Sequence, residues 1–315
     1  MAAAVLCGCQ NAPETEVATK ACAPMPTGRA SACACVLDGK AYVFGGRDEK
    51  GDFKNDLWEY DPQADAWTNL GETPMKARVN ATMAGTDGKV YVGLGYSATH
   101  AYRDSAYMKD WWEYTPTTGT WKRLADFPNA NTVAGVSTAS GDAIYVLYGF
   151  GYGYTRTICQ YDISTDTWKT LPNNPQQPIS NFGGRGAMCN GLFYYGLGYK
   201  ISNLTQWYEA DLPTNTWAKK RSLPGKGREF AACAADEKYV YIFGGRHFAG
   251  DMTGGEVFET YLRYEPTQNR WEWCGTMPCG RAENQVAFSI GGIVYFGLGE
   301  DENGKVLNVL YKVES

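Results

Sequence analysis

Short apolar runs alternate with polar, glycine-rich turns along the chain, and no stretch shows a helical period. In the first copy of this pattern the apolar runs lie at 32–36, 41–44 and 56–60, and a fourth short run contains Trp67. Asp38-Gly39 between two of these runs is a hairpin signal. Asp61-Pro62 begins a turn, because proline fixes its own φ and lacks an amide hydrogen. The pattern therefore predicts four short strands per copy.

The same order of runs recurs about every fifty residues and is marked by a tryptophan in five copies. The gaps between these tryptophans are 54, 47, 49 and 54 residues, for Trp67, Trp121, Trp168, Trp217 and Trp271. A period of this length is the signature of a repeat architecture, in which each copy buries its faces only against its neighbours. We therefore expect a single domain of repeated small sheets.

The sixth copy ends near Tyr311 without a tryptophan or a fourth strand. The segment Val17–Ala21, followed by Pro24-Met25-Pro26, resembles the end of a copy such as Trp67–Leu70 followed by Pro74-Met75. We expect the N-terminal segment to supply the missing strand of the last sheet. The chain would then close a ring and leave no open edge between its first and last sheets.

Gly45-Gly46 after an apolar strand, then Tyr60-Asp61-Pro62, then a tryptophan six to seven residues later, resembles the Kelch repeat. The resemblance covers residues 17–315 and implies an all-β, six-bladed Kelch β-propeller whose last blade is closed by the N-terminal strand. Two departures concern local packing. Gly-Leu-Gly replaces Gly-Gly in three copies, and Ala210 stands where the turn tyrosine is expected.

Composition excludes some classes of function. The net charge is −5 with both signs mixed along the chain, which argues against a nucleic-acid binder.

The ten cysteines form no Cys-x-x-Cys pair with accompanying histidines, so no metal site and no cofactor are predicted. Small buried thiols near the propeller axis are the favoured interpretation. A Cys274–Cys279 bridge in an oxidising compartment stays open.

The first residues resemble the end of a bacterial lipoprotein signal. Residues 2–10 are a short apolar run that ends in Leu-x-Gly-Cys, and a polar spacer follows it. On this interpretation residues 1–16 are the remnant of a signal and a tether, and Cys9 is the lipidated residue. The protein would be held at the periplasmic or outer surface of the bacterial envelope by its lipid alone. The alternative is a fortuitous cysteine-rich start.

Arginines recur where loops would converge on the channel. Arg29, Arg78, Arg228 and Arg281 open their copies, Arg185 shares the strand parity of the opening residue Asn181, and Arg47 and Arg246 follow their glycine pairs. Directed at one rim, these guanidinium groups would form a positive surface for carboxylates or phosphates. The opening arginines could equally hold neighbouring blades together, and both roles stay open.

The loops after the glycines carry tyrosines, among them Tyr96, Tyr152 and Tyr199. A tyrosine offers a flat apolar face and a polar tip, which beside arginines suits a sugar, an acidic one especially. These rings could also simply pack the loops. We expect a monomer that binds a small anionic ligand or glycan fragment at the channel mouth through these tyrosines and the seven arginines.

An enzyme is the alternative function. The repeat also resembles the sialic-acid (N-acetylneuraminate) mutarotase family, which implies a glutamate proton acceptor just after a glycine in a middle blade. Here Tyr199-Lys200 occupies the comparable place, and the remaining candidate is Glu300, which follows Gly299 in the last blade. Arginines would hold the sugar carboxylate while a carboxyl group moves the proton.

The sequence argues against two other chemistries of related propellers. A copper site like that of the galactose-oxidase central domain requires two histidines and two tyrosines, one pair adjacent as Tyr-His, yet His100 and His247 both lack a preceding tyrosine. The sialidase Asp-box is also missing, because residues 164–168 lack its glycine.

Overall fold

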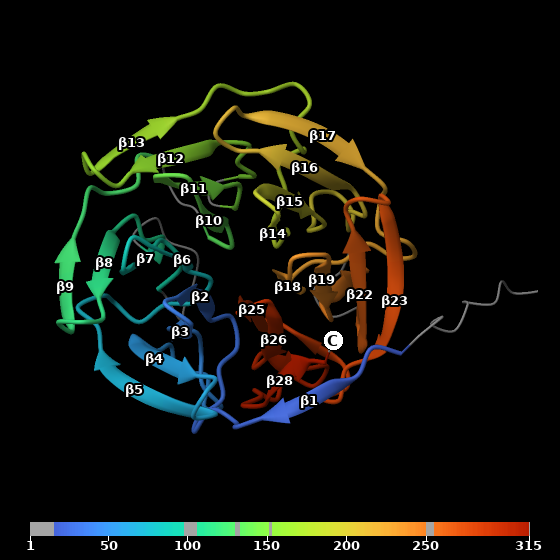
Figure 1. Ribbon diagram of the computed structural model, residues 1–315, viewed down its shortest axis with the longest axis horizontal. Helices are drawn as coiled ribbons and strands as arrows, with labels where there is room; N and C mark the ends of the chain where they lie inside the picture. Colours follow the sequence, from blue (N-terminus) through green and yellow to red (C-terminus); the bar gives the residue numbers. More distant parts are fainter. Residues whose placement is uncertain (1–15, 98–105, 130–132, 151–152, 250–254, 315) are drawn as a thin grey trace, which may run out of the picture.

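The structure is a computed structural model that describes residues 16–97, 106–129, 133–150, 153–249 and 255–314. Six antiparallel four-stranded sheets are arranged as blades around a central channel (Figure 1). The described residues form strands, bridges and turns, and they include no helix that could cross a membrane. The predicted all-β six-bladed propeller is confirmed.

The blades follow one another in chain order. Blade 1 is β2 (Cys33–Leu37), β3 (Lys40–Phe44), β4 (Asp56–Asp61) and β5 (Ala66–Glu72); blade 2 is β6 (Thr82–Thr86), β7 (Lys89–Gly93), β8 (Trp111–Thr115) and β9 (Thr120–Arg123). Blade 3 is β10 (Val136–Ser140), β11 (Ala143–Leu147), β12 (Ile158–Asp162) and β13 (Thr167–Thr170); blade 4 is β14 (Arg185–Cys189), β15 (Leu192–Gly196), β16 (Trp207–Asp211) and β17 (Thr216–Lys220). Blade 5 is β18 (Ala232–Ala235), β19 (Val240–Phe243), β22 (Thr260–Glu265) and β23 (Arg270–Thr276); blade 6 is β25 (Val286–Ile290), β26 (Ile293–Gly297), β28 (Leu310–Val313) and β1 (Thr19–Cys22).

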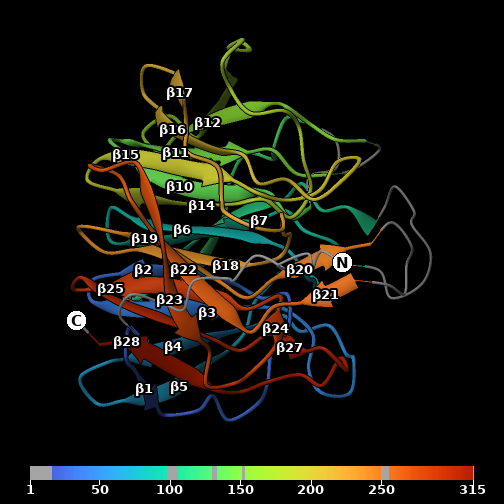
Figure 2. The same cartoon turned by 90° about the vertical axis from the view of Figure 1, so that its right-hand side faces the viewer.

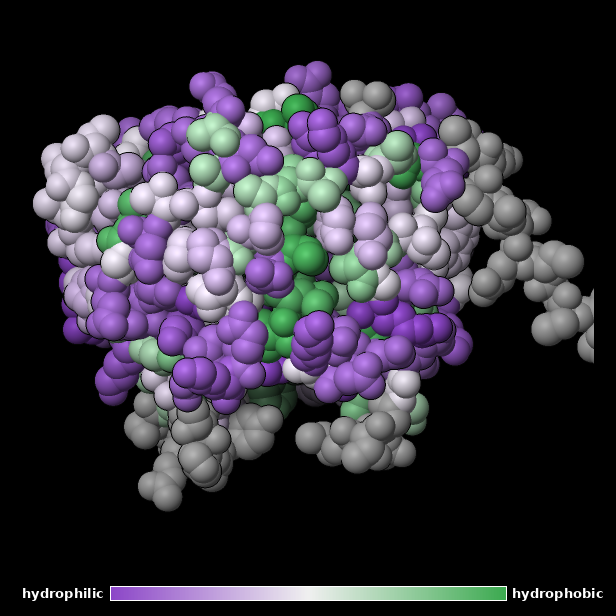
Figure 3. All heavy atoms as spheres, turned by 90° about the horizontal axis from the view of Figure 1, so that it is seen from below, coloured by the Kyte–Doolittle hydropathy of each residue, from purple (hydrophilic) through white to green (hydrophobic). Residues whose placement is uncertain are grey.

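Burial is greatest in the second strand of a blade, whereas innermost strands such as β10, which line the channel, are half-buried. The second strand of a blade packs against a neighbouring blade on each face, and all five residues of β11 are buried. This two-sided burial explains why the second strands read as continuous apolar runs. The outermost strands, such as β5, are largely exposed. Figure 3 shows a mostly hydrophilic outer wall crossed by a narrow hydrophobic strip.

The chain closes its own ring. β1 pairs antiparallel with β28, in a register that runs from Thr19 opposite Val313 to Cys22 opposite Leu310. Figure 1 shows this first strand lying outermost on the last blade. The predicted closure by the N-terminal segment is therefore confirmed, and it covers the edge that β28 would otherwise expose.

The recurring tryptophans join neighbouring blades. Trp67, Trp168 and Trp271 each donate an indole N–H to a backbone carbonyl of the preceding linker, at 2.8 to 2.9 Å. Blade 4 departs from this arrangement, because Ala210 pairs with Trp217 where other blades have a tyrosine. Tyr148 of blade 3 approaches that tryptophan instead, with the ring centroids 6.3 Å apart. A neighbouring blade thus supplies the missing aromatic ring.

Two small ribbons project from one end of the propeller. β20 (Arg246–Phe248) pairs with β21 (Gly255–Val257), and β24 (Ala282–Glu283) pairs with β27 (Glu300–Asp301). Figure 2 shows all four short strands at the same end of the molecule. We call this end the mouth. It carries the loops that the sequence analysis singled out.

Candidate functional site at the mouth of the propeller

Each blade contributes one pair of residues to the mouth. In every pair, the residue after the blade-opening position forms an antiparallel bridge with the residue after the glycine-containing turn. The six pairs are Ala30–Arg47, Val79–Tyr96, Val133–Phe150, Phe182–Tyr199, Glu229–Arg246 and Glu283–Glu300. The repeat therefore presents twelve side-chain positions in a ring, and the residues at these positions decide the chemistry of the mouth.

Glycine makes this close approach possible. Gly245 has a φ of +89°, and a Cβ placed there would lie 2.8 Å from the carbonyl oxygen of Glu229. Only glycine therefore allows the following residue, Arg246, to pair with Glu229 without displacing the opening loop. The glycine pairs of the repeat thus set the geometry of the mouth as well as its turns.

The ring divides into two chemically distinct halves around a cavity of about 800 Å³. Blades 2 to 4 contribute what we call the aromatic half: Val79, Tyr96, Val133, Phe150, Phe182 and Tyr199. Blades 5, 6 and 1 contribute what we call the charged half: Glu229, Arg246, Glu283, Glu300 and Arg47. This volume lies within the range of small-molecule sites. The mouth can therefore hold a ligand with one apolar and one polar side.

Ion pairs neutralise both arginines of the charged half. Arg246 pairs with Glu283, and Arg47 pairs with Glu300. Asn284 also donates its side-chain amide to Glu300 at 2.9 Å. The rim therefore presents paired charges, and the expected surplus of positive charge at the rim is not observed among the described residues.

Glu229 is the exception in the charged half. Its side chain is only 6% exposed and lines the cavity, yet its carboxyl group has no hydrogen-bond partner among the residues that the structure describes. Burial, with a smaller contribution from Glu283, raises the pKa of Glu229 to about 7 despite the opposing charges of Arg246 and Arg185. A buried acid without a partner is costly to keep unless it serves a ligand.

Glu283 has a similarly perturbed carboxyl group. Burial raises its pKa to about 7, and the negative charge of Glu300 acts in the same direction against the attraction of Arg246 and Arg47. Glu229 and Glu283 line the same cavity, and near neutral pH carboxyl groups with such raised pKa values can be present in both protonated and ionised forms. The cavity therefore contains both a hydrogen-bond-donating acid and an accepting carboxylate at physiological pH.

Four of the residues proposed from sequence line this cavity: Arg246, Tyr96, Tyr199 and Glu300. Arg47 reaches it through its ion pair with Glu300. Tyr152 and Cys9 lie outside the described residues. The structure therefore brings both post-glycine arginines and two of the proposed tyrosines to one place.

Three opening arginines lie behind the mouth and bind their own surroundings. Arg29 donates to Asp56 at 2.5 Å, and Arg78 forms a two-pronged pair with Asp110 at 2.6 and 2.9 Å. Arg228 donates to the carbonyl oxygen of Gly244 and lies 4.0 Å from the Phe258 ring, and burial lowers its pKa to about 9. All three are at most 1% exposed, so the blade-joining role is the one their contacts fit.

Arg281 is displaced by one residue from the opening position. Gly245 donates its backbone N–H to the carbonyl of Ala282, just as Gly46 donates to the carbonyl of Arg78. Ala282 is thus the structural equivalent of the opening arginines. Arg281 instead donates to the Val257 carbonyl and lies near two glutamates on the surface, with a third of its side chain exposed.

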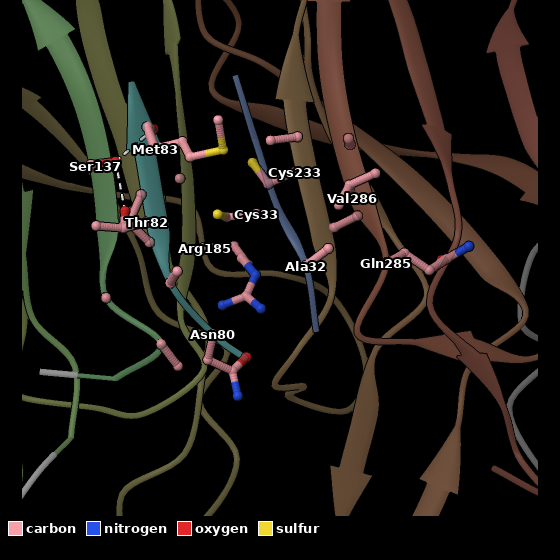
Figure 4. A pocket seen from close by; sticks show the side chains of 18 residues that line it. Ala32, Cys33, Asn80, Thr82, Met83, Ser137, Arg185, Cys233, Gln285 and Val286 are labelled. Atoms are coloured by element: carbon pink, nitrogen blue, oxygen red, sulfur yellow. Dashed lines mark hydrogen bonds between the residues drawn. The ribbon is translucent and has the colours of Figure 1, made fainter. Parts of the chain in front are cut away.

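Arg185 lies below the mouth, inside the channel. It is the first residue of β14 and lines a separate cavity of about 140 Å³ formed by the innermost strands. Figure 4 shows its guanidinium group extending into this space near Cys33 and Asn80. The expectation from strand parity, that this side chain points into the channel, agrees with the structure.

Glu229 and Glu283 were not predicted as site residues from the sequence. Both occupy a ring position that is alanine, valine or phenylalanine in the other four blades. An alignment of the six copies by their opening loops would have revealed both residues, because each places a carboxyl group at a position that is otherwise apolar. The offset of Arg281 obscured this alignment in blade 6.

A second large cavity lies at the opposite end of the propeller. It has a volume of about 870 Å³ and is lined by the polar turns of blades 2 and 3, with Asp87, Lys89, Asp142 and Asp162 among them. Apart from Pro213 of blade 4, its lining comes from blades 2 and 3, whereas the mouth is built by positions from all six blades. Among the described residues, no group of three or more histidine, cysteine and acidic side chains could bind a metal ion.

These features define a class: a six-bladed propeller whose repeat glycines build a ligand-sized mouth. A family model described as the KLHDC2/KLHL20/DRC7 Kelch-repeats domain matches residues 11–198, which is more than half of the chain. The chain belongs to the Kelch-repeat family.

Comparison with known proteins gives relatives from different kingdoms. The chain is 26% identical over 268 residues to Kelch-like protein 25 of Xenopus tropicalis, covering 81% of this chain and 42% of that protein. It is 33% identical over 121 residues to N-acetylneuraminate epimerase of Salmonella arizonae, covering 37% of this chain and 30% of the epimerase. The chain thus matches less than half the length of these relatives.

Among solved structures, that of YjhT superimposes with a TM-score of 0.77 and 17% identity, covering 93% of this chain and 99% of YjhT. At this identity the likeness shows a shared fold. It extends over nearly the whole propeller, and so over all six blades that build the mouth.

Proposed function

We propose that this propeller binds an acidic sugar or a glycan fragment at its mouth. The observation that carries the proposal is the division of one cavity into an aromatic half and a charged half, built on equivalent positions of a six-fold repeat. A sugar ring has the same two-sided chemistry, with C–H groups on its faces and hydroxyl groups around its edge.

The aromatic half suits the faces of a sugar. Its rings are held by edge-to-face contacts, such as Phe150 with Phe182 at 5.5 Å and Tyr199 with Phe248 at 5.2 Å between centroids. Rings fixed in this way lose little conformational freedom when a ligand binds. They can therefore form a stacking platform at small entropic cost.

The charged half suits the hydroxyl edge. Arg246 and Arg47 offer N–H donors, while Glu229, Glu283 and Glu300 offer acceptors or, where protonated, a donor. Each sugar hydroxyl both donates and accepts, so alternating groups of this kind satisfy it. The similarity of part of the chain to N-acetylneuraminate epimerase of Salmonella supports a sugar as the ligand.

Calorimetric titration tests this proposal with N-acetylneuraminate, galacturonate and glucuronate. We expect at least one of them to bind the wild-type protein, and Tyr199→Ala to weaken that binding at least tenfold by removing a stacking face. Tyr239→Ala is the matched control, because this tyrosine lies in the turn at the far end of blade 5. If the Tyr199→Ala variant and the wild type bind the sugar with equal affinity, the ligand does not bind at the mouth.

A second function, sugar mutarotation, is favoured by the two carboxyl groups with raised pKa. Mutarotation opens the ring when a base takes the proton of the anomeric hydroxyl and an acid protonates the ring oxygen, and closing reverses both transfers. Glu229 and Glu283, whose pKa values burial raises to about 7, can divide these two roles near neutral pH. Arg246, paired with Glu283, would hold that carboxyl group in place.

Anomer exchange measured by NMR decides between binding alone and catalysis. Catalysis predicts that wild-type protein accelerates exchange of N-acetylneuraminate and that Glu229→Gln loses about 10²–10⁴-fold of the acceleration. The control is Glu237→Gln, an exposed residue in the blade 5 turn. If exchange proceeds at the uncatalysed rate with wild-type protein that binds the sugar, the mutarotase proposal fails and binding alone remains.

We further propose that the protein is attached to the bacterial envelope by a lipid on Cys9. Support comes from the sequence Leu6-Cys7-Gly8-Cys9, followed by a polar spacer. In cells that produce the protein and are fed an alkyne-tagged fatty acid, the wild type should acquire the label, Cys9→Ser should lose it, and Cys7→Ser should keep it. Equal labelling of all three proteins would refute attachment through Cys9.

A further inference from the structure

Among the residues that the structure describes, those lining the channel just below the mouth include one charged side chain. At the first paired position of the innermost strands the six blades place Cys33, Thr82, Val136, Arg185, Ala232 and Val286. Arg185 is the only charged residue among all the described residues that line the channel cavity. Five copies of the repeat thus keep this level of the channel neutral, and blade 4 introduces a full positive charge.

No ion pair neutralises that charge among the described residues, although the carboxyl group of Glu229 acts on it from beyond ion-pair distance. Within the described part of the chain, the only hydrogen bond of the Arg185 guanidinium is a donation to the carbonyl oxygen of Gly184 at 2.9 Å, and no carboxylate lies within ion-pair distance. The central carbon (Cζ) of this guanidinium group lies 5.7 Å from the centroid of the Phe230 ring. A guanidinium group has five N–H donors, so most of its capacity is unused. Its situation differs from that of Arg29, Arg47, Arg78 and Arg246, which all have carboxylate partners.

Asn80 supplies a second free donor at the same level. Its side chain lines both the mouth and the channel cavity, so it lies where the two spaces meet. Among the described residues, its amide group has no hydrogen-bond partner. Figure 4 shows the Arg185 side chain extending toward Asn80. The other polar side chains of the cavity are neutral, and two of them, Thr82 and Ser137, bond to each other at 2.6 Å.

The size of the cavity restricts what can bind there. Its volume of about 140 Å³ exceeds the roughly 10–15 Å³ that admits a water but falls below the roughly 300 Å³ of small-molecule pockets. A sugar ring therefore stays in the mouth, and one small group of the ligand can enter the channel. A planar anion with two oxygens matches the fork of a guanidinium group and offers acceptors to the Asn80 amide.

We propose that this part of the channel is a carboxylate subsite: Arg185 and Asn80 bind the acid group of a sugar acid whose ring occupies the mouth. The inference rests on the proposed sugar-binding function and deepens it, because it assigns selection for acidic over neutral sugars to Arg185. The rim arginines already form ion pairs with carboxylates, whereas Arg185 forms none with any residue in the described part of the chain.

The test compares a sugar acid with its neutral ester in three proteins. N-acetylneuraminate and its methyl ester are titrated into wild type, Arg185→Met and Arg123→Met, the last being an exposed arginine of an outer strand. We expect the wild type and Arg123→Met to prefer the acid at least tenfold, and Arg185→Met to bind acid and ester equally, at the affinity of the wild type for the ester. Arg185→Lys, which keeps the charge without the fork, should recover part of the preference.

An undiminished preference for the acid in Arg185→Met would overturn the subsite. If neither sugar binds the wild type, the proposed function fails. The carboxylate subsite is then tested separately, by comparing the thermal unfolding temperature in acetate with that in chloride at equal ionic strength. Acetate that raises the unfolding temperature of the wild type, but not that of Arg185→Met, would keep a carboxylate subsite for another ligand. Equal shifts of the unfolding temperature in the wild type and in Arg185→Met would refute the carboxylate subsite.

Discussion

At the scale of single residues, the mouth is defined by departures from the repeat. Glu229, Glu283 and Arg185 each stand at a position that is small or apolar in most other blades. The repeat supplies the backbone geometry six times, so these positions carry little structural demand for charge. The charged side chains at these positions support the proposed ligand site, and their energetic cost to the fold is measurable.

Glu229→Gln should stabilise the protein at alkaline pH. Burial raises the pKa of Glu229 to about 7, so folding favours the protonated acid. The stability that this acid contributes is full below its unfolded pKa of roughly 4.3 and is lost as pH rises through about 7. Glutamine cannot ionise and avoids this loss. We expect urea unfolding to show near-equal stability at pH 4 and a gain on the order of 1–3 kcal/mol at pH 8.

Glu237→Gln provides the control for this measurement, since its side chain is exposed. It should leave the free energy of unfolding unchanged at both pH values. A Glu229→Gln variant that is less stable than wild type at pH 8 would mean that the ionised carboxylate is stabilised in the free protein.

At the scale of elements, the loops before the innermost strands are anchored by buried arginines. Asp56 and Asp110, which accept from Arg29 and Arg78, each lie two residues before a tryptophan of their blade's third strand, Trp58 or Trp112. The attraction of Arg78 and the hydrogen bond from Trp112 outweigh burial and lower the pKa of Asp110. The anchor therefore stays ionised and fixes the third strand to the loop behind the mouth.

Arg78→Met should destabilise the fold strongly. It leaves the buried side of Asp110 without its charged partner, a change that costs about 3–5 kcal/mol in comparable sites. Arg281→Met, at the displaced position of blade 6, should cost about 1 kcal/mol or less because its contacts are at the surface. Urea unfolding measures both, and equal losses would contradict the distinction between the two arginines.

The sequence allowed the repeat, the strands and the closure to be predicted because glycines recur in every copy and a tryptophan in five of the six. It did not allow the partner of each arginine to be predicted. Whether Arg78 points at a ligand or at Asp110 depends on contacts between segments 32 residues apart. The carboxyl groups of the mouth were missed for a different reason, because they stand out only after the opening loops are aligned by backbone hydrogen bonds.

At the scale of the whole molecule, the ring depends on β1. This strand is paired to β28 and followed by Ala23, which accepts the indole N–H of Trp67 and so links blade 6 to blade 1. Without β1, the edge of β28 would be exposed to other chains. The mouth is formed by all six blades, so its geometry depends on this closure.

Removing β1 should destabilise the propeller and promote association. A chain that begins at Ala23 should be less stable than one that begins at Val17 by on the order of 2–5 kcal/mol, from lost ladder hydrogen bonds and burial. It should also form larger species in size-exclusion chromatography. Two monomeric chains of equal stability would show that the ring does not need this strand.

A crystal structure of the protein with N-acetylneuraminate would test the proposed site most directly. We predict that the sugar lies in the mouth with its ring against Phe150, Phe182 or Tyr199. Its hydroxyl groups should point toward Glu229 and Arg246, and its carboxylate toward Arg185. A sugar bound in the cavity at the opposite end or on the outer wall, with the mouth empty, would contradict this prediction.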